Sequence, residues 1–137
     1  MPPSRGDSTS PLQPGASHAL HRRIRDRAVA TANRQAFIEH ARSFDPLFLE
    51  CGATRVIEGW GDDVPAGKLT DFARAVQAGP DETVVFSWIE WPDKATRDAG
   101  TRKMMEDPRM ASGAADMPFD GKRMIFGGFE CVVELGR

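Results

Sequence analysis

Residues 83–92, TVVFSWIEWP, constrain the fold more than any other part of this chain, because they form its longest apolar run. Successive side chains of a β-strand point to opposite faces, and a strand at the surface of a two-layer domain is polar on one of them. The run therefore predicts a central strand that is covered on both sides. Its faces are Val84, Phe86, Trp88 and Glu90 on one side and Val85, Ser87, Ile89 and Trp91 on the other.

Helices of the same chain can cover only one of these faces, since the sequence offers two strong helix candidates. A chain of 137 residues is one domain and is too short to supply a second sheet. Leaving large apolar side chains in water would forgo roughly 1.5–3 kcal/mol for each of them. We therefore expect a partner subunit to cover the second face, in a homodimer.

Composition excludes several classes of protein. A formal net charge of −2 and a pI near 5.9 argue against a general binder of nucleic acids or anionic membranes. No stretch approaches the roughly 18 apolar residues of a membrane span, and no apolar signal-peptide core is present. Cys51 and Cys131 are isolated and lack metal-site spacing, which indicates reduced thiols. The sequence predicts a cytoplasmic protein.

The patterns along the chain predict an α+β domain with an antiparallel sheet and two main helices. Asn33 is a candidate N-cap for a helix over residues 33–50, which Pro46 interrupts. Asp93 is a candidate cap for a second helix, which Pro108 stops and a short turn follows. Strands are expected at residues 53–60, 70–78, 83–92 and 124–135. This order is that of a ferredoxin-like domain without its first strand.

Several longer motifs are similar to those of a known family. They are DVPAGKLTDFARAV, VVFSWIEWP, RDAG with KMMEDPRM, and DMPFDGKRMIFGGFE, together with residues 48–53, Glu58 and Trp60. On these motifs, from Asn33 onward, the chain resembles the YbaA-like bacterial family of unknown function. The resemblance implies a dimeric α+β barrel, in which two ferredoxin-like sheets face each other. It implies no activity, because none is established for the family.

The front of the chain departs from that family. Residues 1–17 are rich in Pro, Ser and Gly, which predicts a disordered tail, and residues 18–27, HALHRRIRDR, are strongly basic. The resemblance implies a first strand of the form Met-x-Tyr-Ile-Asp-Gly-Phe-Val, and one choice of codons for residues 18–27 encodes such a strand in the second reading frame. Our hypothesis is that the chain up to about Arg27 is translated out of frame, and the alternative is a genuine extension. Residues 1–30 are thus expected to lie outside a domain of residues 31–137.

Acidic residues interrupt three otherwise apolar strands, at Glu58, Glu90 and Glu130. A buried carboxylate is costly unless it is paired. These residues suggest a polar pocket in the barrel, in which a carboxylate acts as a general base or orients a ligand. Alternatively, they pair with arginines or reach solvent at strand ends. The candidate partners are Arg55, Arg74, Arg97 and Arg123.

Aromatic residues complete the candidate pocket, although they could equally pack the core and the dimer interface. His40 is the only histidine outside the front segment, so no His-based triad or metal site can be assembled. The sequence predicts no cofactor and no metal. The candidate ligand-binding residues are Glu58, Trp60, Trp88, Glu90, Glu130 and Arg123.

Two functional hypotheses follow. In the first, the protein is a homodimeric barrel that binds a small organic ligand, or a cofactor-free enzyme of monooxygenase type by fold analogy alone. In the second, it is a non-catalytic stress or interaction protein whose polar strand residues support only the dimer. RNA binding rests on the basic front segment alone, because the chain after residue 34 carries a formal charge of −6.

Overall fold

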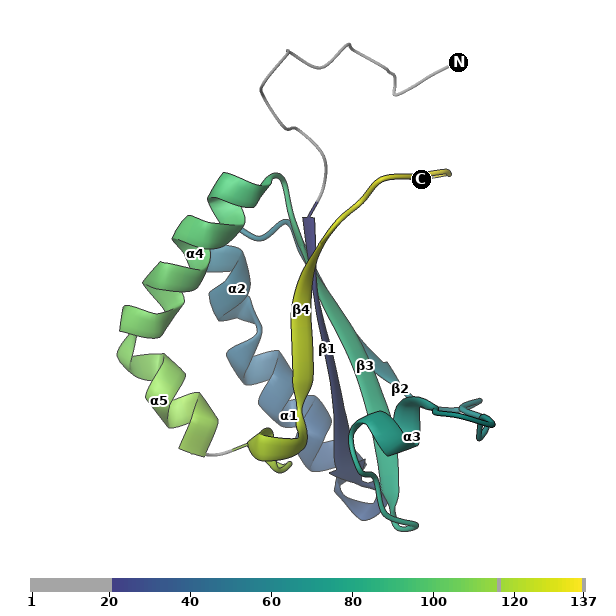
Figure 1. Ribbon diagram of the computed structural model, residues 1–137. Coiled ribbons are helices and arrows are strands. Elements are labelled where there is room, and N and C mark those ends of the chain that lie inside the picture. The colour runs from purple at the N-terminus through teal and green to yellow at the C-terminus, as the bar shows by residue number, and fades with distance from the viewer. Residues whose placement is uncertain (1–20, 116, 137) are drawn as a thin grey trace.

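The computed structural model describes residues 21–115 and 117–136, which form a four-stranded antiparallel sheet with helices packed on one face (Figure 1). The strand order is β2-β3-β1-β4, so β1 and β3 are central. This arrangement confirms the predicted ferredoxin-like α+β fold. The strands are β1 His21–Ala30, β2 Arg55–Trp60, β3 Glu82–Trp91 and β4 Ile125–Glu130.

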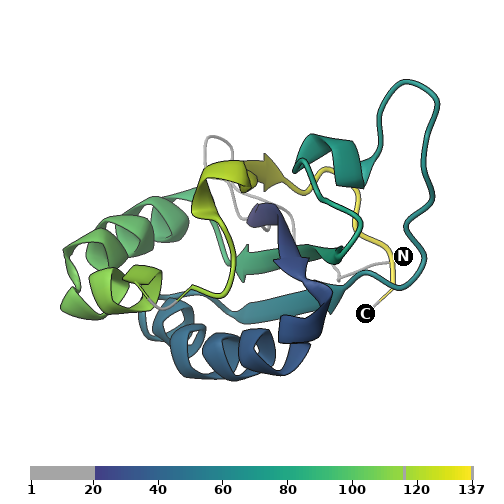
Figure 2. The ribbon, with the colours of Figure 1, turned by 90° about the horizontal axis from the view of Figure 1, so that it is seen from below.

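Four helices lie over one face of the sheet, and Figure 2 shows them along one side of the molecule. Pro46 is the first residue of the second helix, where it causes the predicted break. The Asp93 carboxylate accepts a hydrogen bond of 2.7 Å from the Thr96 backbone N–H, which confirms the predicted cap. Asn33 precedes the first helix but makes no side-chain capping bond. The helices are α1 Arg34–Phe44, which follows the short η1 Thr31–Asn33, α2 Pro46–Glu50, α4 Lys94–Glu106 and α5 Pro108–Ala115.

Strand β3 holds the core together, as its two-sided apolar pattern predicts. Ile89 and Trp91 are each 1% exposed and pack against α2 and α4. Val85 is fully buried in a cluster with Val29 and Phe37. On the opposite face, the third core cluster extends only along one end of the strand. It contains Ala28, Val76 and Val84.

The predicted strand over residues 70–78 is wrong, because this segment contains the short helix α3 Phe72–Ala75. The Asp71 carboxylate accepts a hydrogen bond of 2.7 Å from the Arg74 backbone N–H and so caps the helix. Phe72 and Val76, read as alternate residues of a strand, are also one helical turn apart. α3 packs on the face of the sheet that the other helices leave open (Figure 1).

The predicted last strand is too long at its end. Strand β4 stops at Glu130, and residues 131–136 adopt no regular structure. Val132 and Leu135 are 84% and 90% exposed, so the apolar pattern there is not used for packing. The short η2 Gly121–Arg123 lies in the loop that precedes β4.

The largest difference from the sequence-based expectations concerns strand β1. Residues 1–30 were expected to lie outside the domain, but residues 21–30 form a strand within its sheet. His21–Ala30 is antiparallel to β3 along its whole length and to β4 over residues 21–26. Residues 1–20 lie outside the described part of the chain. Out-of-frame translation stays a hypothesis about the origin of this segment, and the gene's nucleotide sequence would decide it. In the described parts of the chain, no helix is long and apolar enough to cross a membrane.

Candidate functional site

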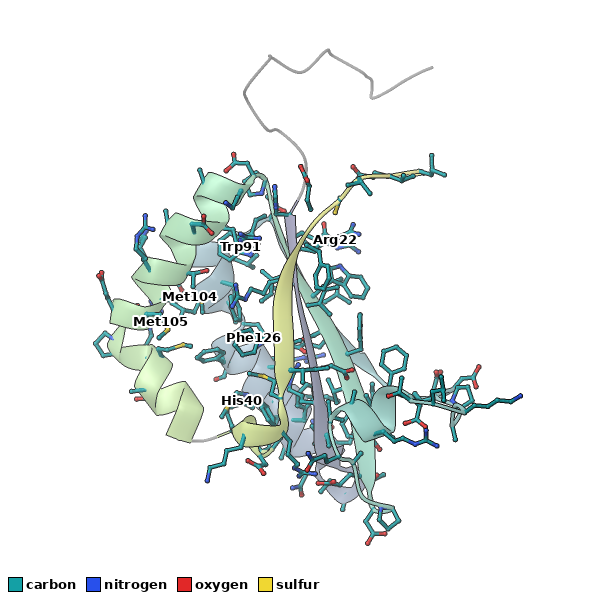
Figure 3. All side chains as sticks on the ribbon, in the orientation of Figure 1. Arg22, His40, Trp91, Met104, Met105 and Phe126 are labelled. Atoms are coloured by element: carbon teal, nitrogen blue, oxygen red, sulfur yellow. The ribbon has the colours of Figure 1, made fainter. Side chains whose placement is uncertain are left out.

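A cavity of about 240 Å³ lies between the sheet and the layer formed by α1, α2, α4 and α5. Its walls are apolar and unusually rich in methionine, whereas its floor on the sheet is charged. Figure 3 shows Met104 and Phe126 in the space between α4 and the sheet. The residues used below are Met104, Met105, Met110, Phe44 and Phe126 in the walls and Arg23, Arg25, Arg27, Asp45 and Glu58 at the floor.

The register of the sheet places three arginines of β1 under the helices. Directly opposed residues of antiparallel strands share a face. Arg25 is opposite Ser87 and Arg27 is opposite Val85, and both of these β3 residues are buried beneath the helix layer. Alternation then places Arg23 on the same face. The Arg27 side chain is only 2% exposed.

Glu58 of β2 receives two of these arginines. Arg27 Nη2 donates to Glu58 Oε1 at 2.6 Å, and Arg25 Nη2 donates to Glu58 Oε2 at 3.0 Å. Arg27 Nη1 also donates to the Ser87 hydroxyl at 2.9 Å. Asp45, the residue between α1 and α2, lies with its Oδ1 4.0 Å from Arg25 Nη2. The cluster therefore joins two guanidinium groups to two carboxyl groups at the cavity floor.

Burial and close charges shift the ionisation of this cluster. Burial raises the pKa of Asp45 to about 8, and its hydrogen bond with Glu58 adds to that effect. Burial alone would also raise the pKa of Glu58, but the hydrogen bond from Asp45 and the charges of Arg27 and Arg25 hold it below its ordinary value. The proton of the pair therefore resides on Asp45, and Glu58 carries the charge.

Buried polar atoms without a hydrogen-bond partner are concentrated in β1. Among the described residues there are seven such side-chain atoms, and six of them belong to residues 21–27. They include Nε of Arg25 and Nε of Arg27 in the cavity floor. Each unsatisfied buried group costs roughly 1–3 kcal/mol. Strand β1 is therefore the element whose polar groups this fold satisfies least.

The structure separates the sequence-predicted site residues instead of joining them in one pocket. Glu58 and Trp60 are on the helix-covered face, where Trp60 packs 6.0 Å from the Phe37 ring. Trp88 and Glu90 are on the opposite face, and Trp88 Nε1 donates to Glu90 Oε2 at 2.9 Å. Arg22 approaches the same Glu90 oxygen at 3.6 Å, and Figure 3 shows it on the side away from the helices.

Arg123 and Glu130 lie away from the cavity. Arg123 forms two hydrogen bonds of 2.8 Å with Glu82 and thereby ties η2 to the start of β3. The hydrogen bond from Arg123 is the main reason why the pKa of Glu82 falls to about 2. Glu130 is exposed at the end of β4. Both residues fit the alternative of arginine pairs and strand ends better than a ligand-binding role.

The candidate ligand-binding residues predicted from the sequence do not include Arg25, Arg27 and Asp45. The signal was present, because arginines at every second position of residues 23–27 would share one face of a strand. No local pattern singles out Asp45, because its partners Arg25 and Glu58 come from other elements of the fold. Among the described residues, no cluster of three or more His, Cys, Asp or Glu side chains could hold a metal ion.

Fold and site together define a ferredoxin-like α+β domain with a charged cavity beneath its helices. The family model described as "Protein of unknown function (DUF1428)" matches residues 27–121. This match covers more than half of the chain, so the protein belongs to the DUF1428 family. The match begins within β1, at the last of its three cavity arginines.

The relatives agree with this assignment. The chain is 54% identical over 107 residues to an uncharacterized protein, YbaA, of Escherichia coli K12, covering 78% of this chain and 92% of the relative. The same figures hold for YbaA of Shigella flexneri. A crystal structure of a dimeric ferredoxin-like protein from an uncultured marine organism superposes with a TM-score of 0.54 at 10% identity. It covers 85% of this chain and 99% of its own, and it supports the fold alone.

The ionisation of Asp45 predicts how stability changes with pH. The unfolded chain loses this proton near the ordinary pKa of 3.8, whereas the folded chain keeps it until about pH 8. The folded state thus binds more protons between these values, and the free energy of unfolding falls as pH rises, by up to about 1.4 kcal/mol per pH unit. Asp45→Asn mimics the protonated carboxyl, so we expect this decline to disappear in urea unfolding at pH 5 to 8.

Asp63→Asn is the matched control, because Asp63 is exposed in a loop and should leave the decline in place. An Asp45→Asn protein that loses stability over this range as steeply as the unmodified protein would show that Asp45 does not hold the proton.

Proposed function

We propose that this protein binds a small organic molecule in the cavity between its sheet and its helices. The observation that carries the proposal is the lining: apolar walls enclose buried, partly unsatisfied charged groups. Ligand sites combine apolar walls with a few placed polar groups in this way. A volume of about 240 Å³ lies below the roughly 300 Å³ at which drug-sized pockets begin, so a small ligand is expected.

The methionine walls favour a ligand site over a gap in a packed core. Met104 is 4% exposed and part of the core, but Met105 beside it is 69% exposed and marks the outer side of the cavity. Methionine side chains are flexible and polarizable, and they adapt to guests of different shape. The methionine side of the cavity can therefore adjust to a bound ligand.

The out-of-frame hypothesis offers a competing account of the same arginines. In that account, the family's own first strand would not carry these arginines. Their Nε groups lack hydrogen-bond partners because an out-of-frame sequence occupies a buried position in the sheet. The start of the family match at Arg27 is consistent with this account. The gene's nucleotide sequence separates the two, because out-of-frame translation requires a start codon and the family's first strand in the second frame.

The ligand proposal predicts that the purified protein carries a bound molecule. Native mass spectrometry should detect extra mass that denaturation releases. Ala41→Leu places a larger side chain in the cavity and should remove that mass, because Ala41 lines the cavity and is 9% exposed. Ala36→Leu on the exposed side of the same helix is the control and should keep it.

Equal extra mass on the Ala41→Leu and Ala36→Leu proteins would place the molecule elsewhere and contradict the proposal. Thermal unfolding of both variants checks that they fold. The cavity can accommodate the added methyl groups of Ala41→Leu, so we expect no loss of stability from it.

We also infer that the protein is a homodimer, which supports the second candidate function of an interaction protein. The sheet face opposite α1, α2, α4 and α5 is covered only in part by α3, and it presents large apolar side chains. The ferredoxin-like structure from the marine organism is described as dimeric. A second copy of the same apolar face is a self-complementary partner for it. These side chains are Ile24, Ile57, Phe86, Trp88, Ile125 and Phe129.

Arg22 and Glu90 lie at one margin of this face, where they pair with each other within the chain at 3.6 Å and so leave no unpaired charge to oppose the contact. We further infer a cytoplasmic location, since Cys51 and Cys131 are both free.

Native mass spectrometry should therefore give twice the mass of 15.0 kDa. Phe129 is 56% exposed in the single chain, so Phe129→Asp should leave the fold intact but give monomers, because burial of each Phe129 is worth roughly 1.5–3 kcal/mol to the dimer. Leu49→Asp is a matched control on the helix side, at 49% exposure, and should remain dimeric. A dimer that survives Phe129→Asp but not Leu49→Asp would place the interface on the helices.

A further inference from the structure

We propose that the ligand of the cavity is an amphiphilic organic anion, a carboxylate on a short apolar body whose charged group is received by Arg23 and Arg25. The inference rests on the proposed function and adds the chemical class of the ligand. It follows from the charge balance of the floor, from the partners of each arginine and from the nature of the walls.

Positive charge exceeds negative charge at the floor. Arg23, Arg25 and Arg27 face the cavity together with only two carboxyl groups, those of Asp45 and Glu58. At least one guanidinium charge is thus unbalanced even if both acids are ionised. Burial under the helix layer makes an unbalanced charge costly, and an anionic ligand would remove that cost. A cationic or zwitterionic ligand would instead need a carboxylate that is free to bind it. The Glu58 carboxylate already accepts hydrogen bonds from Arg25 and Arg27, so such a ligand is disfavoured.

Arg23 is the arginine best placed to receive a ligand. Among the residues that the structure describes, no carboxylate lies within ion-pair distance of its guanidinium, which packs 5.0 Å from the Phe126 ring centre. Burial and the like charge of Arg97 lower the pKa of Arg23, and the charge of Asp98, which pairs with Arg97, opposes this effect only in part. An incoming carboxylate would give the Arg23 guanidinium a direct ion-pair partner, which the described residues do not supply.

Arg25 and Arg27 differ in how fully they are engaged. Arg27 uses both terminal nitrogens, one on Ser87 and one on Glu58, and it is structural. Arg25 uses only Nη2, which donates to Glu58 and lies 4.0 Å from Asp45 Oδ1, and its guanidinium is 5.1 Å from the Phe48 ring centre. A guanidinium can bind a carboxylate through two parallel hydrogen bonds, so Arg23 and Arg25 together can hold one oxyanion group.

The remaining walls select the apolar part of the ligand. Above the arginines, the cavity is bounded by Met104, Met110, Phe44 and Phe126. These side chains offer dispersion contacts and no fixed hydrogen-bond donors or acceptors. His40 and Thr101 also line the cavity, but the Thr101 hydroxyl already donates to the Arg97 backbone carbonyl at 2.8 Å. A short alkyl or aryl chain fits the apolar part of this lining.

The experiment compares octanoate with octanamide, which share the alkyl chain and differ in the charge of the head group. Calorimetric titration of the full chain, stripped of bound molecules by denaturation and refolding, measures both affinities. A hydrogen bond to a charged group is worth more than a neutral one, so we expect octanoate to bind about tenfold or more tightly than octanamide.

Arg23→Gln should reduce this preference to less than about threefold and leave octanamide binding unchanged. Arg55→Gln removes the same charge from an exposed position on the opposite face and should leave both affinities unchanged. Thermal unfolding of each variant confirms folding, and the comparison on the unmodified protein stands even where a variant fails to fold.

Three outcomes are distinguishable. A preference for octanoate that depends on Arg23 supports the inference. Equal binding of octanoate and octanamide leaves the cavity as a ligand site but overturns its assignment to anions. Binding of neither probe overturns the proposed function together with the inference.

Discussion

The buried ion pair between Arg27 and Glu58 is the interaction on which the rest of the structure depends. Arg27 is 2% exposed, so its charge must be met within the protein. Glu58 of β2 and Ser87 of β3 meet it, and three adjacent strands are thereby joined beneath the helices. Removing either charge of a buried pair typically costs 3–5 kcal/mol, about as much as a large core truncation.

The same pair shapes the cavity. Because Arg27 and Glu58 occupy the floor, the helices above cannot close with apolar side chains alone, and Asp45 at the break between α1 and α2 joins the polar cluster. The helices therefore pack closely on the sheet at Ile89 and Trp91, whereas a cavity remains above the arginines. The two central strands thus divide the roles: β3 supplies the packing of the domain, and β1 supplies the arginines of its candidate site.

Local signals predicted much of the fold. The two-sided pattern of β3, the Asp93 cap and the Pro46 break each depend on neighbouring residues. The strand predicted over residues 70–78 was wrong because the spacing of its apolar residues also fits a helical turn. The Asp71 carboxylate caps that turn and so favours the helix. The site could not be assembled, because whether two strand residues share a pocket depends on register and face: Glu58 and Glu90 lie on opposite sides of the sheet. The sequence did not predict strand β1, because its arginines favour an exposed segment more than Ala28 and Val29 favour a buried strand. The residues that pair with the buried arginines come from distant segments of the chain, so the sequence pattern did not reveal them.

The most direct test of this account is amide hydrogen exchange of β1 in the full chain, followed by mass spectrometry of peptides that cover residues 21–30. Strand β1 is paired with β3 and β4, so the account predicts exchange as slow as that of β3. Exchange at the rate of an unstructured chain, with β3 still protected, would contradict it. The sheet would then lack one of its two central strands, and the arginine cavity built on that strand would not exist.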